Sequence, residues 1–238
     1  MAHRIFDLLH NGEGAGIPAP SSGAAQYFYQ LRIYFWQFLF LNCLLILASL
    51  PVITFPAALS AANRVCIKII RDRGALVWLE FRDEFKASFK KGLLMGLYFA
   101  MWMFADYYLL SLGVTNWENP FGVLFLAAGI VLFAVLAVWS AYAFVLLASL
   151  ELPAGQLLRN ARALMFLGGR WTLAVFGVLL GVIGLSVLFF PVSAVPLLAG
   201  GIVLTQYTVC WFVNHPMQEW IIAPYERSTS AETAGRST

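Results

Sequence analysis

Five long apolar segments, separated by short polar ones, dominate the pattern of the chain. They cover residues 33–53, 92–112, 121–150, 172–190 and 196–213. Each is close to or above the roughly 20 residues that an α-helix needs to cross a bilayer. The pattern therefore predicts an all-α fold, a polytopic transmembrane helical bundle of about five spans.

Three shorter segments between the spans carry apolar residues on one side of a helix and basic residues on the other. They are residues 56–71, 78–91 and 156–167, and we expect each to be an amphipathic helix at the cytoplasmic surface of the membrane. In 78–91 an aromatic stripe runs beside the basic residues. That stripe fits insertion into lipid and packing against the bundle equally well, because both bury the same face.

Polar tails are predicted at both ends of the chain. Residues 1–27 are rich in glycine, proline and serine, a composition that favours a flexible amino-terminal tail. Residues 226–238 are predicted to be a disordered carboxy-terminal tail. The membrane domain then covers residues 28–225.

Composition and charge placement support a membrane protein and suggest its orientation. Of the 238 residues, 61% are hydrophobic and 11% charged, whereas a soluble domain is about one quarter charged. The connections 54–91 and 151–171 hold eleven of the 15 Lys and Arg residues. Basic connections stay in the cytoplasm, so five spans put the amino terminus outside and the carboxyl terminus inside. If 56–70 instead enters the membrane as a short or re-entrant helix, the amino terminus moves to the cytoplasm.

Polar groups within the predicted spans are few. Asp106 is the only acidic one, and a charge inside a membrane is costly. It lies toward the outer end of its helix beside Tyr107 and Tyr108, and we read it as an interfacial residue. Asn42 and Gln206 lie nearer the middle of other spans and are expected to bond to neighbouring helices. The alternative is a small solute or ion transporter or channel that uses Asp106 and these amides.

Catalytic motifs are not recognisable in the sequence: there is no catalytic triad, zinc-protease motif, phosphate loop or metal-ligand spacing. We therefore expect a non-enzymatic protein without a cofactor, metal or disulfide, which contacts membrane lipids and no nucleic acid. The sequence does not indicate its oligomeric state. The candidate residues for binding lipid headgroups or a partner come from the amphipathic helices, namely Arg64, Lys68, Arg71, Trp78, Arg82, Lys86, Lys90, Arg159 and Arg162.

The order of prolines, aromatic residues and basic residues between Leu41 and Ala100 resembles that of the YesL-like family of bacterial integral membrane proteins. A later block, between Leu152 and Ala161, is similar to a second block of that family. The resemblance covers most of residues 28–225. Its motifs are Leu41-Asn42, Leu50-Pro51, Phe55-Pro56-Ala57-Ala58, Phe81-x3-Phe85-Lys86-x2-Phe89-Lys90-Lys91-Gly92, Leu152-Pro153 and Leu158-Arg159-Asn160-Ala161.

This resemblance implies a multi-pass protein of the bacterial plasma membrane, from a family without an established biochemical activity. Genes of the family often stand beside carbohydrate import permeases, solute-binding proteins and glycoside hydrolases. The resemblance thus implies an accessory role in carbohydrate uptake of the ABC type, with an importer permease as the partner. The chain lacks a recognisable coupling-loop signature of importer permeases, so we do not expect it to be the translocating subunit itself.

Overall fold

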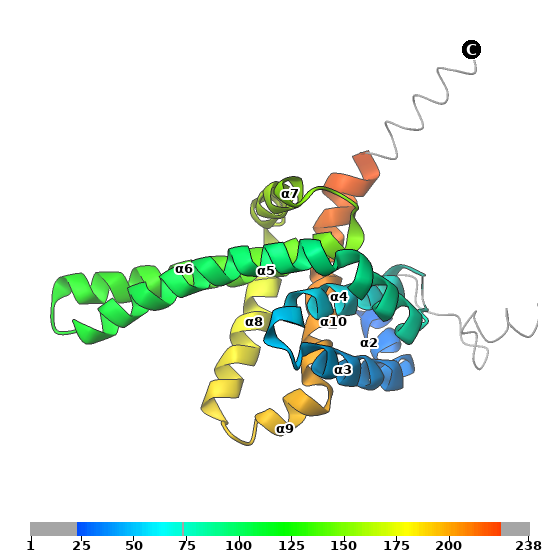
Figure 1. Ribbon diagram of the computed structural model, residues 1–238, viewed down its shortest axis with the longest axis horizontal. Helices are drawn as coiled ribbons and strands as arrows, with labels where there is room; N and C mark the ends of the chain where they lie inside the picture. The colour runs from blue at the N-terminus through cyan, green and yellow to red at the C-terminus, as the bar shows by residue number, and fades with distance from the viewer. Residues whose placement is uncertain (1–22, 73, 225–238) are drawn as a thin grey trace, which may run out of the picture.

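The computed structural model describes residues 23–72 and 74–224, and within these ranges it is helical with no strand (Figure 1). The all-α prediction is confirmed. The predicted tail 226–238 lies outside the described residues, and the last five residues of the tail predicted at 1–27 belong to a helix. The α-helices are α2 (Gly23–Ile33), α3 (Phe35–Ser49), α4 (Phe55–Asp72), α5 (Val77–Thr115), α6 (Pro120–Ser149), α7 (Ala154–Leu167), α8 (Arg170–Leu188), α9 (Ala194–Pro196) and α10 (Ile202–Met217).

Shorter helical turns join or extend these elements. A 3-10 turn, Val52–Thr54, leads into α4, and π-helical segments at Leu197–Gly201 and Gln218–Ile222 flank α10. Together with the α-helices they give five stretches of the described chain that are long and apolar enough to cross a membrane. These are Val52–Asp72, Val77–Thr115, Pro120–Ser149, Arg170–Leu188 and Ala194–Ile222.

The last three of these stretches confirm helices where spans were predicted at 121–150, 172–190 and 196–213. The first predicted span, 33–53, is wrong in its extent. α3 ends at Ser49: Leu50 still has helical dihedral angles, but Pro51, which has no backbone N–H to donate, is extended with a ψ of 110°. α2 and α3 reach the length of a span only together, and they meet at 70°.

The segments predicted separately as 78–91 and 92–112 form the single helix α5. Nothing between Lys91 and Gly92 stops a helix, since a glycine in a helix interior costs only about 1 kcal/mol relative to alanine. An unbroken helix of 39 residues is about 58 Å long, nearly twice the ~30 Å of a bilayer core. The prediction of two separate helices is therefore wrong. If the second half of α5 crosses the membrane, its charged first half cannot lie along the surface, and the surface location of 78–91 stays a prediction.

α4 lies at the centre of the fold, in contact with α3, α5, α6 and α10. The helix predicted at 56–71 is confirmed, and it packs among other helices instead of lying apart from them, while its location relative to the membrane surface stays a prediction. Eleven of its 18 residues are buried, and they come from both sides of the helix. Alanines at positions 57, 58, 61 and 62 leave little side chain between α4 and its neighbours, which lets other helices approach closely.

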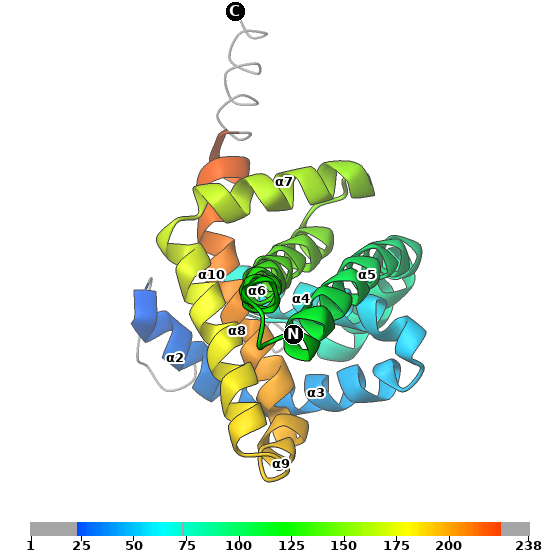
Figure 2. The same cartoon turned by 90° about the vertical axis from the view of Figure 1, so that its left-hand side faces the viewer.

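The helices are not all parallel. α5 and α6 form a hairpin whose tip projects away from the other helices, and α8 and α10 run across it (Figure 1). The view turned by 90° shows the same crossing, with α7 lying over the upper ends of α8 and α10 (Figure 2). Glycines close the hairpin, since a Cβ on Gly113 would lie 2.6 Å from the backbone nitrogen of Leu126. One membrane normal cannot run along both the hairpin and the α8–α10 pair.

The surface of the molecule is strongly apolar. On α8 only Val175 is buried, and large exposed hydrophobic residues also cover the outer halves of α5 and α6. A soluble protein rarely exposes contiguous apolar patches beyond a few hundred Å². The hydrocarbon core of a bilayer, in contrast, solvates such a surface. It also favours helices, because they satisfy their own backbone hydrogen bonds. The structure is therefore that of a membrane protein.

Candidate functional site

Polar and small residues of α5 that face α4 recur at every fourth position. In order they are Glu80, Glu84, Ser88, Gly92 and Gly96, which share one face because positions i and i+4 are neighbours on a helix. α4 runs antiparallel along this row, with its basic residues beside the glutamates and its proline-alanine start beside the glycines. We refer to this contact as the polar α4–α5 interface.

The basic side chains of α4 are used inside the protein. Lys68 forms an ion pair with Glu80, and its side chain is 35% exposed. The Nη1 of Arg64 donates to the backbone oxygen of Ala148 at the end of α6, at 3.0 Å, and its charge acts on the carboxylate of Glu84. The guanidinium of Arg64 thus joins α4, α5 and α6.

Arg71, at the carboxyl end of α4, also has partners within the chain. Its Nε donates to the side-chain oxygen of Asn214 at 3.0 Å, and its Nη2 lies 3.7 Å from the sulfur of Met217. Three of the nine candidate residues for lipid or partner binding, Arg64, Lys68 and Arg71, are therefore already engaged in internal contacts. Their binding to a headgroup stays a prediction.

The other six candidates lie on exposed surface. Trp78 is 56% exposed near the start of α5. Arg82 is exposed and hydrogen-bonds the adjacent Asp83 at 3.0 Å. We call the four remaining cations the exposed basic set; none of them has an ion pair within the described part of the chain. The set comprises Lys86, Lys90, Arg159 and Arg162.

The aromatic stripe of α5 divides between the two expected environments. Phe81 is buried, and its ring lies 6.1 Å from that of Phe85, which in turn lies 5.8 Å from Phe89. Phe81 and Phe85 thus pack against the bundle, as one of the two expectations has it, and Phe89 contacts the ring of Phe85 edge-on along the same helix. Only Trp78, the first member of the stripe, presents most of its ring to the outside.

The three polar residues predicted within spans do not come together. Asn42 is buried and bridges a break in the last helix, where its Nδ2 donates to the oxygen of Leu198 at 2.7 Å and its Oδ1 accepts from the nitrogen of Val203 at 3.3 Å. Asp106 is 1% exposed within the α5–α6 hairpin, and its Oδ1 has no partner among the described residues. Asp106 is thus buried in the protein, its location at the membrane interface stays a prediction, and Gln206 lies elsewhere, facing a cleft.

That apolar cleft has a volume of about 590 Å³ and is bounded by α4, α5, α6, α8 and α10. Ser140, Thr205 and Gln206 are the polar residues that line it. The hydroxyl of Ser140 donates to the oxygen of Ala137 at 2.9 Å, and that of Thr205 to the oxygen of Gly201 at 2.7 Å. Gln206 has no hydrogen-bond partner in the part of the chain that the structure describes.

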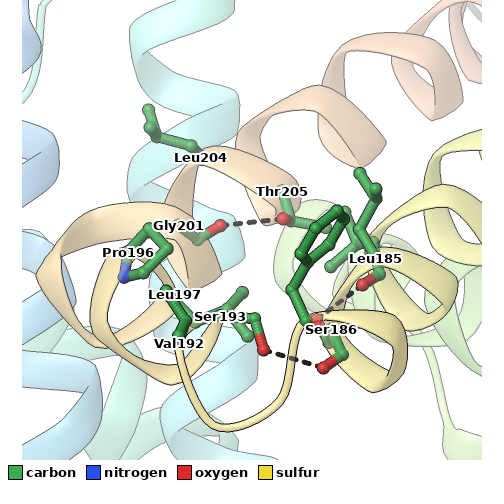
Figure 3. A pocket seen from close by; sticks show the side chains of 11 residues that line it. Leu185, Ser186, Val192, Ser193, Pro196, Leu197, Gly201, Leu204 and Thr205 are labelled. Carbon is green, nitrogen blue, oxygen red and sulfur yellow. Dashed lines mark hydrogen bonds between the residues drawn. The ribbon is translucent and has the colours of Figure 1, made fainter.

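A second hollow of about 530 Å³ lies beside the cleft, at the turn between α8 and α9, and shares Val182, Leu197 and Thr205 with it. Figure 3 shows its lining, which is aliphatic and aromatic apart from a few hydroxyls. The hydroxyl of Ser193 donates to the backbone oxygen of Ser186 at 2.7 Å, and that of Ser186 donates to the backbone oxygen of Val182. These hydroxyls are therefore already hydrogen-bonded to the backbone. Both hollows accordingly suit an apolar ligand and offer few hydrogen-bond donors.

The polar α4–α5 interface falls within the one stretch of the chain that matches a known family. Residues 38–108 match the family described as "Protein of unknown function, DUF624". The YesL-like family is known as DUF624, so the match agrees with the resemblance carried by the same residues. The DUF624 match covers less than one third of the chain, and the block at 152–161 lies outside it. Searches of curated proteins and of solved structures found no match.

Reasoning from the sequence missed both the acidic row of α5 and the cleft. The row was detectable, because Glu80, Glu84 and Ser88 continue at the same spacing into Gly92 and Gly96. The basic residues of α4 are followed in the sequence by Glu80 and Glu84 of α5. This order of charges favours pairing of the two helices over contact of α4 with lipid headgroups. The cleft carried no comparable signal, because its walls come from five helices and consist of residues common in any apolar span.

Proposed function

We propose that this protein is a non-enzymatic accessory subunit of the bacterial plasma membrane, associated with an ABC-type carbohydrate uptake system. One observation carries the proposal: four exposed cations, Lys86, Lys90, Arg159 and Arg162, have no ion pair within the described residues, while the cations of α4 are used internally. Unpaired basic groups next to apolar helices suit anionic lipid headgroups or an acidic surface of a membrane partner.

The two helices that carry the exposed basic set are close in space. Lys91, next to Lys90, donates from Nζ to the backbone oxygen of Leu152 at 3.3 Å, just before α7 begins. This contact brings the charged first half of α5 near the start of α7. A combined surface supports stronger electrostatic binding than either helix alone, since each basic residue near an anionic membrane contributes about 1 kcal/mol.

Support for the carbohydrate-uptake role comes from the resemblance to the YesL-like family alone. The transporter alternative has less support from geometry, because Asn42, Asp106 and Gln206 lie in three separate places. A pathway for a polar solute needs such groups in sequence along one cavity. The apolar cleft bounded by the crossed helices is lined almost entirely by apolar residues.

Lipid binding is tested with purified protein in mixed micelles titrated with phosphatidylglycerol or phosphatidylcholine. We expect phosphatidylglycerol to raise the melting temperature more, and the difference to shrink strongly in Lys86→Gln/Lys90→Gln/Arg159→Gln/Arg162→Gln. The matched control, Lys86→Arg/Lys90→Arg, keeps the charge and should keep the difference. Equal responses to both lipids in the native protein would remove headgroup binding from the proposal.

Partner binding is tested by chemical cross-linking in native membranes and purification in a gentle detergent. We expect an importer permease to be recovered in stoichiometric amount and to be lost in the fourfold glutamine variant. Recovery of the protein without a permease from membranes of cells grown on a range of carbohydrates would contradict the accessory role.

A further inference from the structure

The apolar cleft between the crossed helices has no assigned occupant, and its chemistry narrows the choice. Its wall holds aromatic and aliphatic side chains from five helices, among them Phe99, Phe144 and Val209. Water fills a cavity only where it finds two to four polar partners. Here the hydroxyls of Ser140 and Thr205 already donate to their own helices, so Gln206 is the one side chain of the wall with free donors, and most of the cleft offers ordered water no partner.

An empty cleft of about 590 Å³ is also unfavourable, because interiors are packed with few voids larger than one water molecule. A helix from another protein is a poor occupant of so narrow a space, since with its side chains an α-helix is about 10–12 Å across. A thin, flexible, apolar molecule fits the space better.

The rim of the cleft connects it to the lipid-facing surface. Val52, Phe55 and Ile183 line the cleft and are also exposed, at 84%, 46% and 41%. Surrounding lipid can enter past these residues without meeting a charged group.

We propose that the apolar cleft binds the acyl chain of a membrane phospholipid, which enters from the bilayer past Val52, Phe55 and Ile183. The adjoining hollow at the α8–α9 turn extends the same site, since the two share Val182, Leu197 and Thr205. Gln206 is the single amide in the wall, and an acyl chain needs no bond from it. This site is independent of the exposed basic set and goes beyond the proposed accessory role.

The experiment uses the full chain in phosphatidylcholine vesicles that contain a phospholipid with a diazirine in the middle of one acyl chain. After illumination, mass spectrometry locates the labelled residues. We expect labels on cleft residues such as Ala137 and Val209 in the native protein. Labels confined to the outer faces of α8 and the α5–α6 hairpin would overturn the proposal, and this result needs no variant.

Two matched variants on α6 then test the volume of the cleft. Ala137→Phe fills the cleft and should lower labelling of Val209 at least about fivefold, whereas Ala128→Phe, on an exposed part of the same helix, should leave it unchanged. An equal effect of both variants would contradict the site.

Gln206→Leu separates an acyl chain from a polar occupant. It replaces the amide by an apolar side chain of similar size, so labelling by the acyl probe should be unchanged or higher. A clear loss of labelling would mean that the occupant depends on the amide, and would overturn an acyl-chain site. Cross-links between two copies of the protein at the cleft, in place of lipid labels, would also overturn it.

Discussion

In α4 and α8 the relation between charge and burial is the reverse of that in a water-soluble protein. α4 carries Arg64, Lys68 and Arg71 and yet lies at the centre of the fold, whereas α8 has no charge after Arg170 and buries only Val175. In water this arrangement would expose the apolar helix and bury the charged one. In a bilayer it is favourable, because lipid solvates α8 while α5 and α6 supply partners for the cations of α4.

The comparison extends to two glycine pairs with the same spacing. Gly92 and Gly96 of α5 meet the start of α4, where a Cβ on Gly92 would lie 3.2 Å from the Cα of Ala57 and one on Gly96 would overlap the ring of Pro56. Gly177 and Gly181 of α8 have nothing within 4 Å of an added Cβ. An identical sequence spacing therefore supports close packing in one helix and exposure in the other.

The largest effect is expected from Gly92→Ala/Gly96→Ala. Each added methyl group pushes against the backbone of Ala57 or the ring of Pro56, and overpacking of this kind costs about 1–3 kcal/mol per site. The measurement is the free energy of unfolding in mixed micelles, followed by tryptophan fluorescence. Unchanged stability would show that α4 does not pack this closely on α5.

Replacing Arg64 by methionine should have the next largest effect. Methionine keeps much of the apolar stem but leaves the backbone oxygen of Ala148 and the carboxylate of Glu84 without the guanidinium. Loss of a hydrogen bond to a charged group costs about 1.5–3 kcal/mol. The same unfolding measurement applies, with Arg159→Met on exposed α7 as the control that should change stability little. Equal losses in both variants would argue against a structural role for Arg64.

The smallest effect, of opposite sign, is expected from Gly177→Ala/Gly181→Ala. With no neighbour to displace, each alanine should stabilise α8 by up to about 1 kcal/mol through its higher helix propensity. The unfolding free energy of purified protein is the readout. If this pair instead destabilises the protein, the glycine face of α8 is in contact with another helix, and α8 is not purely lipid-exposed.

The sequence predicted the helices better than their surroundings. The apolar runs that form α6, α8 and α10 are long and uninterrupted, so their length alone indicated a helix. The location of α4 was missed because a basic stripe fits a headgroup layer and an acidic neighbouring helix equally well, and only the partner decides. The continuity of α5 was missed because a change from polar to apolar residues at Lys91 and Gly92 looked like a boundary, although it breaks no hydrogen bond.

The candidate site was predictable only where one helix supplies it. Cations on the exposed side of α5 and on α7 were identified from their spacing, since helical periodicity alone fixes which residues share a face. The burial of Asp106 depends on how α5 pairs with α6, and the apolar cleft depends on how α8 and α10 cross that hairpin. That crossing is decided by contacts between residues far apart in the chain, which no local pattern contains.

Asn42 has a consequence for the order in which the chain is assembled at the membrane. Its side chain holds Leu198 and Val203 around Gly200, whose φ of 155° interrupts the last helix, and 161 residues separate Asn42 from Val203. At about 5–20 residues per second, a ribosome takes roughly 8–32 s to synthesise that interval. During this time the amide of Asn42 is without its final partners, so the newly made amino-terminal helices wait for the last one before the fold can close.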